Sequence, residues 1–276
     1  MADVDGDGVA DLISGCYSRH DSDMAGEFSL YRGRKGADFG PREILMTADE
    51  EEILELPIPK GSDRICRVAT AACVVDLDGD GRDDLLVGGL GSFALYRGAK
   101  GGGFLAAKEP MTDAKGDRLY TPAFAGPCCV DWDGDGDLDI VSGSKSGGVY
   151  LSENRGDRGR PAFGEFVTLI APPVEWDGKQ PPRFGDWHLN GPGDSTRVWV
   201  EDIDGDGRLD LLVGDRIDVY RPGEGLDEPT ARRRWLEIGR KITPQMEADE
   251  ILPLRAQQRR AIPGEGRGHI WFFRGR

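Results

Sequence analysis

Residues 131–143 read DWDGDGDLDIVSG, with aspartate at the first, third, fifth and ninth positions and glycine at the fourth and sixth. The same pattern recurs without gaps at residues 3–15 (DVDGDGVADLISG), 76–88 (DLDGDGRDDLLVG) and 202–214 (DIDGDGRLDLLVG). Four copies with identical offsets show an internal repeat. Repeats of this length are typical of folds in which one supersecondary unit stacks on the next.

Short apolar runs flank every copy of this loop. One run precedes the loop, a second run follows it and ends in glycine, and a third contains an aromatic residue, as in LYR at 30–32 and 95–97, VYL at 149–151 and VYR at 219–221. Short runs of β-branched and aromatic residues between glycines are typical of strands. Four short antiparallel strands per repeat indicate a β-propeller blade. The sequence therefore predicts an all-β fold, a β-propeller of about four loop-bearing blades in a single domain over residues 1–276.

The segment over residues 227–260 departs from this pattern. It opens with DEP, a typical helix start, and continues with an arginine-rich stretch that also carries apolar residues. We expect one or two short helices here, interrupted at Pro244 and Pro253. This helical insertion lies near the C-terminus and divides the fourth repeat.

After the insertion, residues 268–275 return to a strand pattern. Their FFRG sequence echoes the LYRG of the third strands. We expect this C-terminal strand to pair near Val219 and Tyr220. The first loop begins at Asp3, which leaves only Met1 and Ala2 for the strand before it. The sequence therefore predicts an incomplete ring, open as an arc, whose uncovered sheet faces would promote association.

The four loops have the composition of calcium sites. Calcium takes six to eight hard oxygen ligands on a flexible frame. Aspartates at alternate positions can turn their carboxylates toward one point, glycine at position 6 permits the sharp turn, and the backbone carbonyl of position 7 adds an oxygen. The predicted ligands are Asp3, Asp5, Asp7, Val9 and Asp11; Asp76, Asp78, Asp80, Arg82 and Asp84; Asp131, Asp133, Asp135, Asp137 and Asp139; and Asp202, Asp204, Asp206, Arg208 and Asp210.

Position 12 distinguishes these loops from EF-hands. An EF-hand needs a bidentate glutamate there, whereas this sequence has Ser14, Val87, Ser142 and Val213. The flanking residues also indicate strands, so the loops are predicted to close β-hairpins. Aspartate–glycine pairs alone favour hairpin turns, but this does not explain four carboxylates at the same offsets in four copies. We predict up to four bound Ca²⁺ ions.

The charge of the chain supports the same interpretation. Its formal net charge is −15, and the sixteen aspartates at positions 1, 3, 5 and 9 of the loops account for this excess. The acidity therefore concerns cations, and it disfavours nucleic acid as a partner. There is no apolar run of about 18 residues, so we expect no membrane-spanning helix. The N-terminus also lacks the layout of a signal peptide.

Cysteine usage indicates neither a zinc site nor a redox motif. The five cysteines are Cys16, Cys66, Cys73, Cys128 and Cys129, and they form no Cys-x-x-Cys pair. Cys73 and Cys128 each stand three residues before the first loop aspartate of their repeat. We interpret them as small buried strand residues.

The units resemble FG-GAP/VCBS repeats, which form the calcium-loop blades of integrin α-subunits and of many bacterial secreted proteins. The resemblance covers residues 1–221 and, more loosely, the last strand. The Phe-Gly and Gly-Ala-Pro sequences that name the family are largely missing, which places the chain nearer the bacterial VCBS-like branch. The resemblance implies a calcium-stabilised propeller that is extracellular, periplasmic or on the cell surface. It also implies an adhesion or scaffold module that binds a protein or glycan partner.

Two functions of different classes remain open at this stage. The favoured one is a non-catalytic calcium-binding propeller, and the alternative is a propeller-fold polysaccharide lyase or hydrolase that uses the loop over residues 171–197. The chain has only three histidines, at 20, 188 and 269, and no nucleophile-elbow or zinc-protease motif. In that loop a cluster of aromatic and polar residues could stack on and hold a sugar ring. Alternatively, its aromatic side chains could simply pack the loop against the rest of the protein. The residues of this group are Trp176, Arg183, Asp186, Trp187 and His188.

Overall fold

A computed structural model describes residues 2–15, 27–36, 38–51, 53, 71–89, 91–121, 126–174, 179–186 and 189–275. This part of the chain is mostly β-structure and forms four antiparallel sheets, each from one repeat. We call these sheets the first to fourth blades.

The strands of each blade follow one another along the chain. The first blade has the order β1-β2-β3 and the second β4-β5-β6-β7. The third has the order β8-β9-β10-β11 and the fourth β12-β13-β14. The bounds are β1 Leu12–Gly15, β2 Phe28–Arg34, β3 Asp38–Ile44, β4 Ala71–Val75, β5 Asp84–Gly88, β6 Phe93–Gly98 and β7 Phe104–Pro110. Those of the other two blades are β8 Gly126–Val130, β9 Asp139–Gly143, β10 Val149–Ser152, β11 Val167–Ile170, β12 Asp194–Glu201, β13 Asp210–Tyr220 and β14 Gly264–Phe273.

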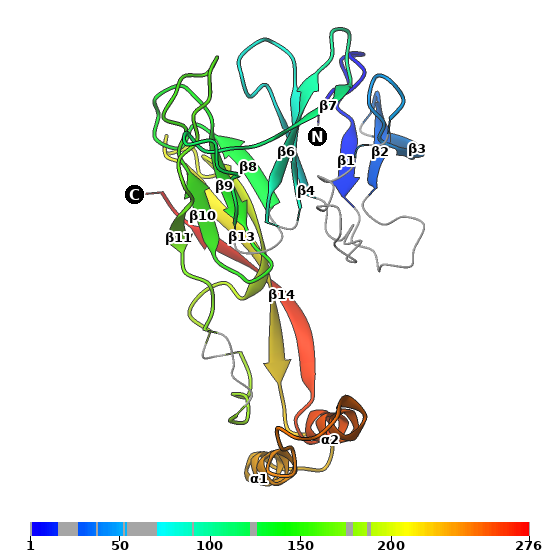
Figure 1. The fold of residues 1–276 in the computed structure, drawn as a ribbon, viewed down its shortest axis with the longest axis vertical. Coiled ribbons are helices and arrows are strands. Elements are labelled where there is room, and N and C mark those ends of the chain that lie inside the picture. The colour runs from blue at the N-terminus through cyan, green and yellow to red at the C-terminus, as the bar shows by residue number, and fades with distance from the viewer. Residues whose placement is uncertain are drawn as a thin grey trace.

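The apolar core lies between neighbouring blades. Leu30 of the first blade packs with Leu85 of the second, Leu86 of the second with Ile140 of the third, and Val141 of the third with Val213 of the fourth. Each strand therefore turns alternate side chains toward the preceding and the following blade, as the period of two in a strand requires. The blades form an open, propeller-like array (Figure 1). This confirms the predicted fold class.

The first blade lacks a full inner strand among the described residues. Ala2 forms only an isolated antiparallel bridge to Asp11, with backbone hydrogen bonds of 3.1 and 2.7 Å. Ala2 therefore occupies the place that β4 and β8 take in the next two blades.

The fourth blade differs from the prediction. Val219 and Tyr220 were expected in a third strand, but they end β13, which continues past Gly214 without a turn. The reason is that no glycine or proline follows before Arg221, while Ile217 and Val219 keep the alternation of buried residues. The third strand is β14, whose first residues pair with Tyr220 and Val219. The FFRG sequence of β14 pairs near the start of β13, with Phe272 opposite Leu212.

The long β13–β14 ribbon extends beyond the other strands and carries both helices at its end (Figure 1). Helix α1 spans Glu228–Gly239 and α2 spans Ala248–Ala261, within and just beyond the predicted helical segment. Asp227 caps α1 by accepting the Thr230 N–H at 2.9 Å. The two helices pack together in a small core of their own around Trp235.

Pro253 does not break the second helix, contrary to expectation. It lies inside α2, where it removes one backbone donor. The helix continues because a reciprocal capping box between Glu247 and Glu250 holds its start. Near its end, the side chain of Gln258 donates to the Trp235 carbonyl of α1 at 3.1 Å.

Candidate metal centres

Each repeat loop curls around the carboxylate at its first position. In the first loop, Asp3 accepts the backbone N–H groups of Gly6 at 2.9 Å, Asp7 at 3.0 Å and Gly8 at 2.8 Å. Gly6 and Gly8 have φ angles of +75° and +84°, and the matching glycines of the other loops also have positive φ. Only glycine adopts this conformation without a steric penalty. The two glycines therefore allow the loop to bring its carboxylates together.

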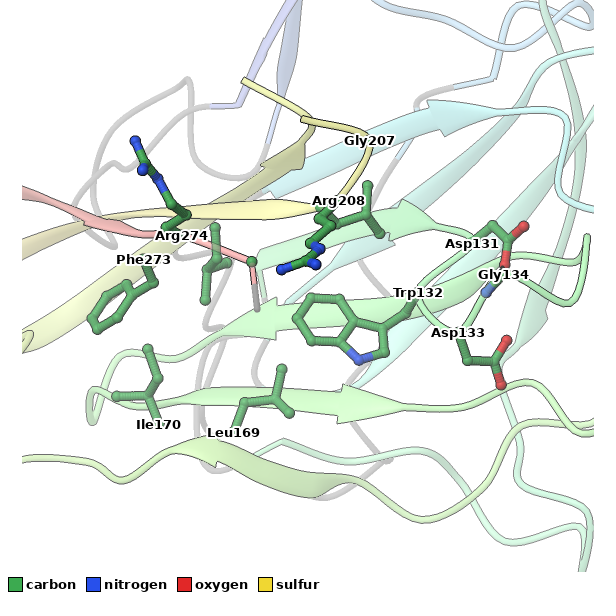
Figure 2. Close-up of a pocket in the computed structure, with 13 residues that line it drawn as sticks. Asp131, Trp132, Asp133, Gly134, Leu169, Ile170, Gly207, Arg208, Phe273 and Arg274 are labelled. Atoms are coloured by element: carbon green, nitrogen blue, oxygen red, sulfur yellow. Dashed lines mark hydrogen bonds between the residues drawn. The ribbon is translucent and has the colours of Figure 1, made fainter. Parts of the chain in front are cut away.

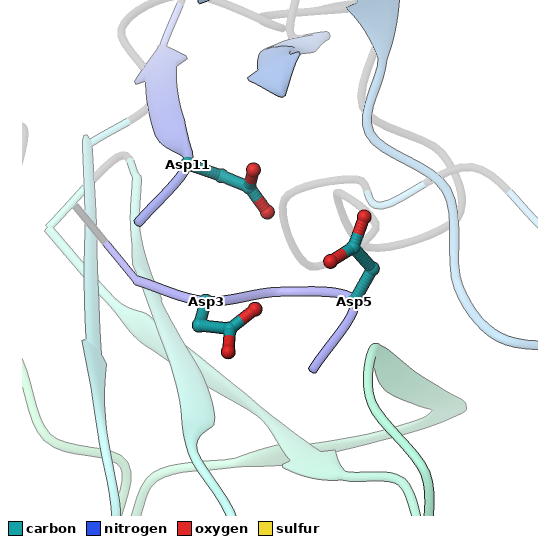
Figure 3. A group of neighbouring side chains, drawn as sticks. All are labelled: Asp3, Asp5 and Asp11. Atoms are coloured by element: carbon teal, nitrogen blue, oxygen red, sulfur yellow. The ribbon is translucent and has the colours of Figure 1, made fainter. Parts of the chain in front are cut away.

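The curl gathers three carboxylates in every loop. Figure 3 shows those of Asp3, Asp5 and Asp11 around one common space. In each loop three such oxygens lie within 4.8 Å of one another. The other three groups are Asp76, Asp78 and Asp80; Asp131, Asp133 and Asp139; and Asp202, Asp204 and Asp206.

These oxygens suit calcium. A calcium ion holds its oxygens at about 2.3–2.6 Å, so two ligands on opposite sides of it are roughly 5 Å apart. The spread of each group stays within that limit, and every donor is a hard carboxylate oxygen. The sequence-predicted residues at positions 1 and 3 belong to the group in all four loops. Position 5 contributes in the second and fourth loops, and position 9 in the first and third.

The fifth position also shapes the backbone. Asp7 accepts the N–H of Val9 at 2.8 Å, and the same contact recurs in the other loops at 2.9, 3.1 and 2.9 Å. This turn fixes the peptide at position 7. The use of the position-7 carbonyls, those of Val9, Arg82, Asp137 and Arg208, as ligands stays a prediction.

The aspartate at position 9 has a structural role that the sequence analysis did not foresee. Asp139 is buried, and its two oxygens accept the N–H of Trp132 at 2.8 Å and of Asn154 at 2.7 Å. It thereby joins the loop to Asn154, two residues beyond the end of β10, the third strand of the blade. In the other blades the position-9 carboxylate likewise accepts the N–H of a glycine at or just beyond the end of the third strand. These bonds run from Gly33 to Asp11 at 2.7 Å, from Gly98 to Asp84 at 2.8 Å and from Gly275 to Asp210 at 2.9 Å.

An arginine faces the aspartate at position 3 in three blades. Arg32 lies 2.7 Å from Asp5, Arg97 lies 2.7 Å from Asp78, and Arg274 lies 2.9 Å from Asp204. These are the arginines of the recurring Leu-Tyr-Arg-Gly sequence and its C-terminal echo. Their repetition at one place in each repeat was the available signal. Each guanidinium reduces the negative charge of its loop.

Among the residues that the structure describes, no arginine faces Asp133 of the third loop. Glu153 stands directly before the Asn154 that contacts Asp139, where the other blades have arginine before the corresponding glycine. This loop also carries an extra carboxylate, that of the buried Asp137. Burial, followed by repulsion from the neighbouring aspartates, raises the pKa of Asp137 to about 6. The third loop is therefore the most electronegative of the four.

A pocket of about 700 Å³ lies between the third and fourth blades on the side of these loops. Trp132, Leu169 and Phe273 give it apolar walls, and Arg208 and Arg274 lie at its edge (Figure 2). Arg208 is exposed, and its guanidinium makes no hydrogen bond or ion pair with the described residues. This pocket was not predictable from the sequence, because its walls come from two repeats that only the fold brings together.

The second predicted site, in the loop over residues 171–197, is described only in part. Trp176, Trp187 and His188 lie outside the described residues. Arg183 is exposed, and Asp186 lies 3.7 Å from Arg267 of β14. The adjoining Phe184 bridges to Tyr220 and has the guanidinium of Arg232 over its ring at 4.7 Å. The described part of this loop therefore packs along the β13–β14 ribbon and α1.

The described cysteines lie in strands, but of the two that were interpreted as buried strand residues only Cys128 is fully buried. Cys128 is buried, while Cys73 and Cys129 are half-buried, and all three are free thiols. Cys73 and Cys128 occupy equivalent positions, opposite Leu86 and Val141. Cys16 and Cys66 lie outside the described residues. Neither described helix is long and apolar enough to cross a membrane.

An open array of antiparallel blades, each with one acidic loop, defines a repeat protein of the propeller type. Residues 131–213, from the third loop to the strand after the fourth, match the FG-GAP-like repeat. Assignment to the VCBS-like branch stays a prediction. No curated protein matches the chain.

Among solved structures, a similar chain is a lectin from Agrocybe aegerita, described as recognising non-reducing terminal N-acetylglucosamine. The two are 18% identical, and the match covers 78% of this chain and 47% of the lectin chain, with a TM-score of 0.38. The chain thus spans about half the length of that lectin.

Proposed function

We propose that the chain is a non-catalytic, calcium-stabilised propeller scaffold that binds a protein or glycan partner. The observation that carries this proposal is the recurrence, in four loops, of three carboxylate oxygens within 4.8 Å of one another. An exposed acidic group can occur without an ion. Four groups that all contain the aspartates at positions 1 and 3, completed by the one at position 5 or 9, favour a common cation.

Calcium would supply positive charge at the centre of each loop. Without it, three or four carboxylates at this distance repel one another. In the second to fourth blades the loop joins the first strand to the second, and in the first blade it joins the Ala2–Asp11 bridge to β1. Relief of that repulsion therefore stabilises the hairpin. The residues that would hold the ion are the aspartates at positions 1, 3, 5 and 9 and the carbonyl at position 7.

Calcium binding of this kind fits an extracellular, periplasmic or cell-surface location. Extracellular calcium modules function with dissociation constants of about 10⁻⁴–10⁻³ M. The loop aspartates are largely solvent-accessible apart from the buried position-9 residues and Asp137. Loops this open suit weak sites, which stay filled where calcium is abundant.

The pocket between the third and fourth blades is the candidate partner site. The ring of Trp132 and the side chain of Phe273 offer apolar surface, and the free guanidinium of Arg208 offers hydrogen-bond donors in a planar fork. This combination suits a ligand with one apolar face and a carboxylate or hydroxyl group, as on a sugar ring or a protein side chain.

The calcium proposal is tested by titration calorimetry on the whole chain. We expect up to four equivalents of calcium to bind and chelation to lower the thermal midpoint. The change Asp135→Asn should remove about one equivalent. Asp218→Asn is the matched control, because Asp218 is an exposed aspartate paired with Arg216 outside the loops. Absence of binding at millimolar calcium, with an unchanged midpoint in excess EDTA, would contradict the proposal.

The partner site is tested on a glycan array and by peptide display with calcium present. If the pocket binds the partner, Arg208→Ala should weaken binding at least about tenfold while the melting curve stays unchanged. Arg155→Ala is the control, since Arg155 is an exposed arginine whose ion pair is with Glu153. A ligand that binds equally well to the Arg208 variant does not use this pocket.

A further inference from the structure

Each blade presents one row of apolar residues to the blade that follows it. In the second blade the row crosses the strands as Cys73, Leu86 and Leu95, which are opposite one another in register. Leu77, the second residue of the loop, extends the row. All four pack against the third blade, and Leu86 and Leu95 are only 0% and 2% exposed.

The third blade repeats this arrangement. Cys128, Val141 and Leu151 are opposite one another in register, and Trp132 is again the second residue of the loop. All four pack against the fourth blade. The same four positions therefore form the contact between blades at two successive boundaries.

In the fourth blade this row is left uncovered. The equivalent residues are Trp199, Leu212 and Phe272, again opposite one another, with Ile203 as the second loop residue. Trp199 is 57% exposed, Phe272 47% and Ile203 45%. Ile270 lies two residues before Phe272 on the same side of β14 and is 80% exposed. Trp271 and Phe273 alternate with them and pack on the third blade.

This exposed face therefore occupies the position that forms the contact with the following blade elsewhere in the array. It consists of Trp199, Ile203, Leu212, Ile270 and Phe272. Contiguous exposed apolar surface usually marks an interaction site. Tryptophan and phenylalanine are enriched in interfaces. Trp199 and Phe272 are also larger than Cys73 and Leu95, the equivalent residues of the second blade. The apolar area of the row is therefore not reduced in the fourth blade.

The far face of the first blade does not match it. The row there is Ser14, Ser29 and Ile44, beside Leu12, Tyr31 and Arg42. Arg42 donates to the Ser29 hydroxyl at 2.8 Å and pairs with Glu27 at 3.2 Å. Ser29 is already buried, and covering this face with the fourth blade of another copy would also bury the Arg42–Glu27 ion pair against aromatic rings, which is costly. A self-complementary contact avoids that cost.

We propose that two copies of this chain pair through their fourth blades, with each Trp199–Leu212–Phe272 row packed on the same row of the other copy. Such an isologous contact closes at two chains. It continues, between chains, the blade-to-blade packing already present within one chain. The inference does not rest on calcium binding.

The test is the mass of the whole chain in solution, measured by light scattering after size exclusion from about 1 to 100 µM. We expect a species of twice the 30.1 kDa chain mass. The change Phe272→Glu enters the interface twice by symmetry, and it should raise the dissociation constant at least about a hundredfold. Val167→Glu is the control, because Val167 is 50% exposed on an outer strand of the third blade.

Three results would overturn the proposal. These are a monomer at every concentration, a dimer that persists in the Phe272 variant, and a mass that grows past two chains. The last would indicate head-to-tail stacking on the first blade. If Phe272→Glu fails to fold, Ile270→Glu replaces it, since a side chain this exposed in the monomer contributes little to its folding. Both variants should keep the thermal midpoint of the diluted wild type.

Discussion

The buried aspartate at position 9 should stabilise its blade even in the absence of calcium. In the third blade the change is Asp139→Ala. It removes a carboxylate that accepts two backbone N–H groups, those of Trp132 and Asn154, and leaves both without their partner. Asp135 is the comparison residue. It is exposed, and the backbone N–H that it accepts, that of Asp137, lies within the same loop.

The expected magnitude follows from these contacts. A hydrogen bond to a charged group contributes about 1.5–3 kcal/mol to stability. Two such bonds set an upper limit of about 3–6 kcal/mol for Asp139→Ala. Burial of the carboxylate, which raises the pKa of Asp139, offsets part of this gain. For Asp135→Ala the loss in EDTA should be below about 1 kcal/mol. In calcium it should rise toward about 2.7 kcal/mol, the contribution of one site at a hundredfold excess over its dissociation constant.

The assay is urea unfolding of wild type and both variants, in EDTA and in excess calcium. Asp139→Ala should be strongly destabilised under both conditions, and Asp135→Ala mainly in calcium. If Asp139→Ala unfolds in EDTA at the same urea concentration as the wild type, the position-9 carboxylate does not hold the blade. In that case its role would be limited to the ion.

Three further changes probe other parts of the chain. Glu153→Arg supplies the third blade with the arginine that the others have. It should weaken calcium binding by the third loop about fivefold in calorimetry, with a smaller effect at high salt. Burial raises the pKa of Asp137 from 3.8 to about 6, so the native state takes up a proton that the unfolded state does not. In EDTA the wild type should lose stability as the pH rises from about 4 through 6. Asp137→Asn should reduce this loss and melt higher at pH 7, while Asp139 and Asp84, whose pKa values burial also raises, keep part of it. Replacing residues 222–262 with an Asn-Gly turn should leave calcium stoichiometry and the melting of the blades unchanged, because the helices form a separate core; loss of folding would show that they belong to the scaffold.

The loops were predictable because their chemistry is local. Within nine residues the first loop contains Asp3, Asp5 and Asp11, and the glycines between them directly indicate a turn. The strand after each loop was equally clear from its apolar run. Local spacing is therefore enough to place the carboxylates of one loop around one point.

The partners of these carboxylates were not predictable in the same way. Arg32 and Arg274 reach their aspartates only through the register of the third strand, and Arg274 comes from the far side of the helical insertion. The path of the fourth blade was missed for a related reason. Gly214 matches the glycines that end the other second strands, yet the backbone there stays extended because its pairing with β14 continues to Tyr220.

The second residue of each loop connects the candidate calcium site to the packing between blades. Its N–H is held by the position-9 carboxylate, as for Ile203 on Asp210 at 3.1 Å, while its side chain faces the following blade. In the fourth blade that side chain belongs to the proposed dimer surface. Asp206→Asn, which weakens calcium binding in the fourth loop, should therefore weaken the dimer several-fold in sedimentation experiments. Asp7→Asn alters the first loop, at the other end of the array, and should leave the dimer unchanged. Equal effects of the two variants would mean that calcium acts on the whole array and that no such local link exists.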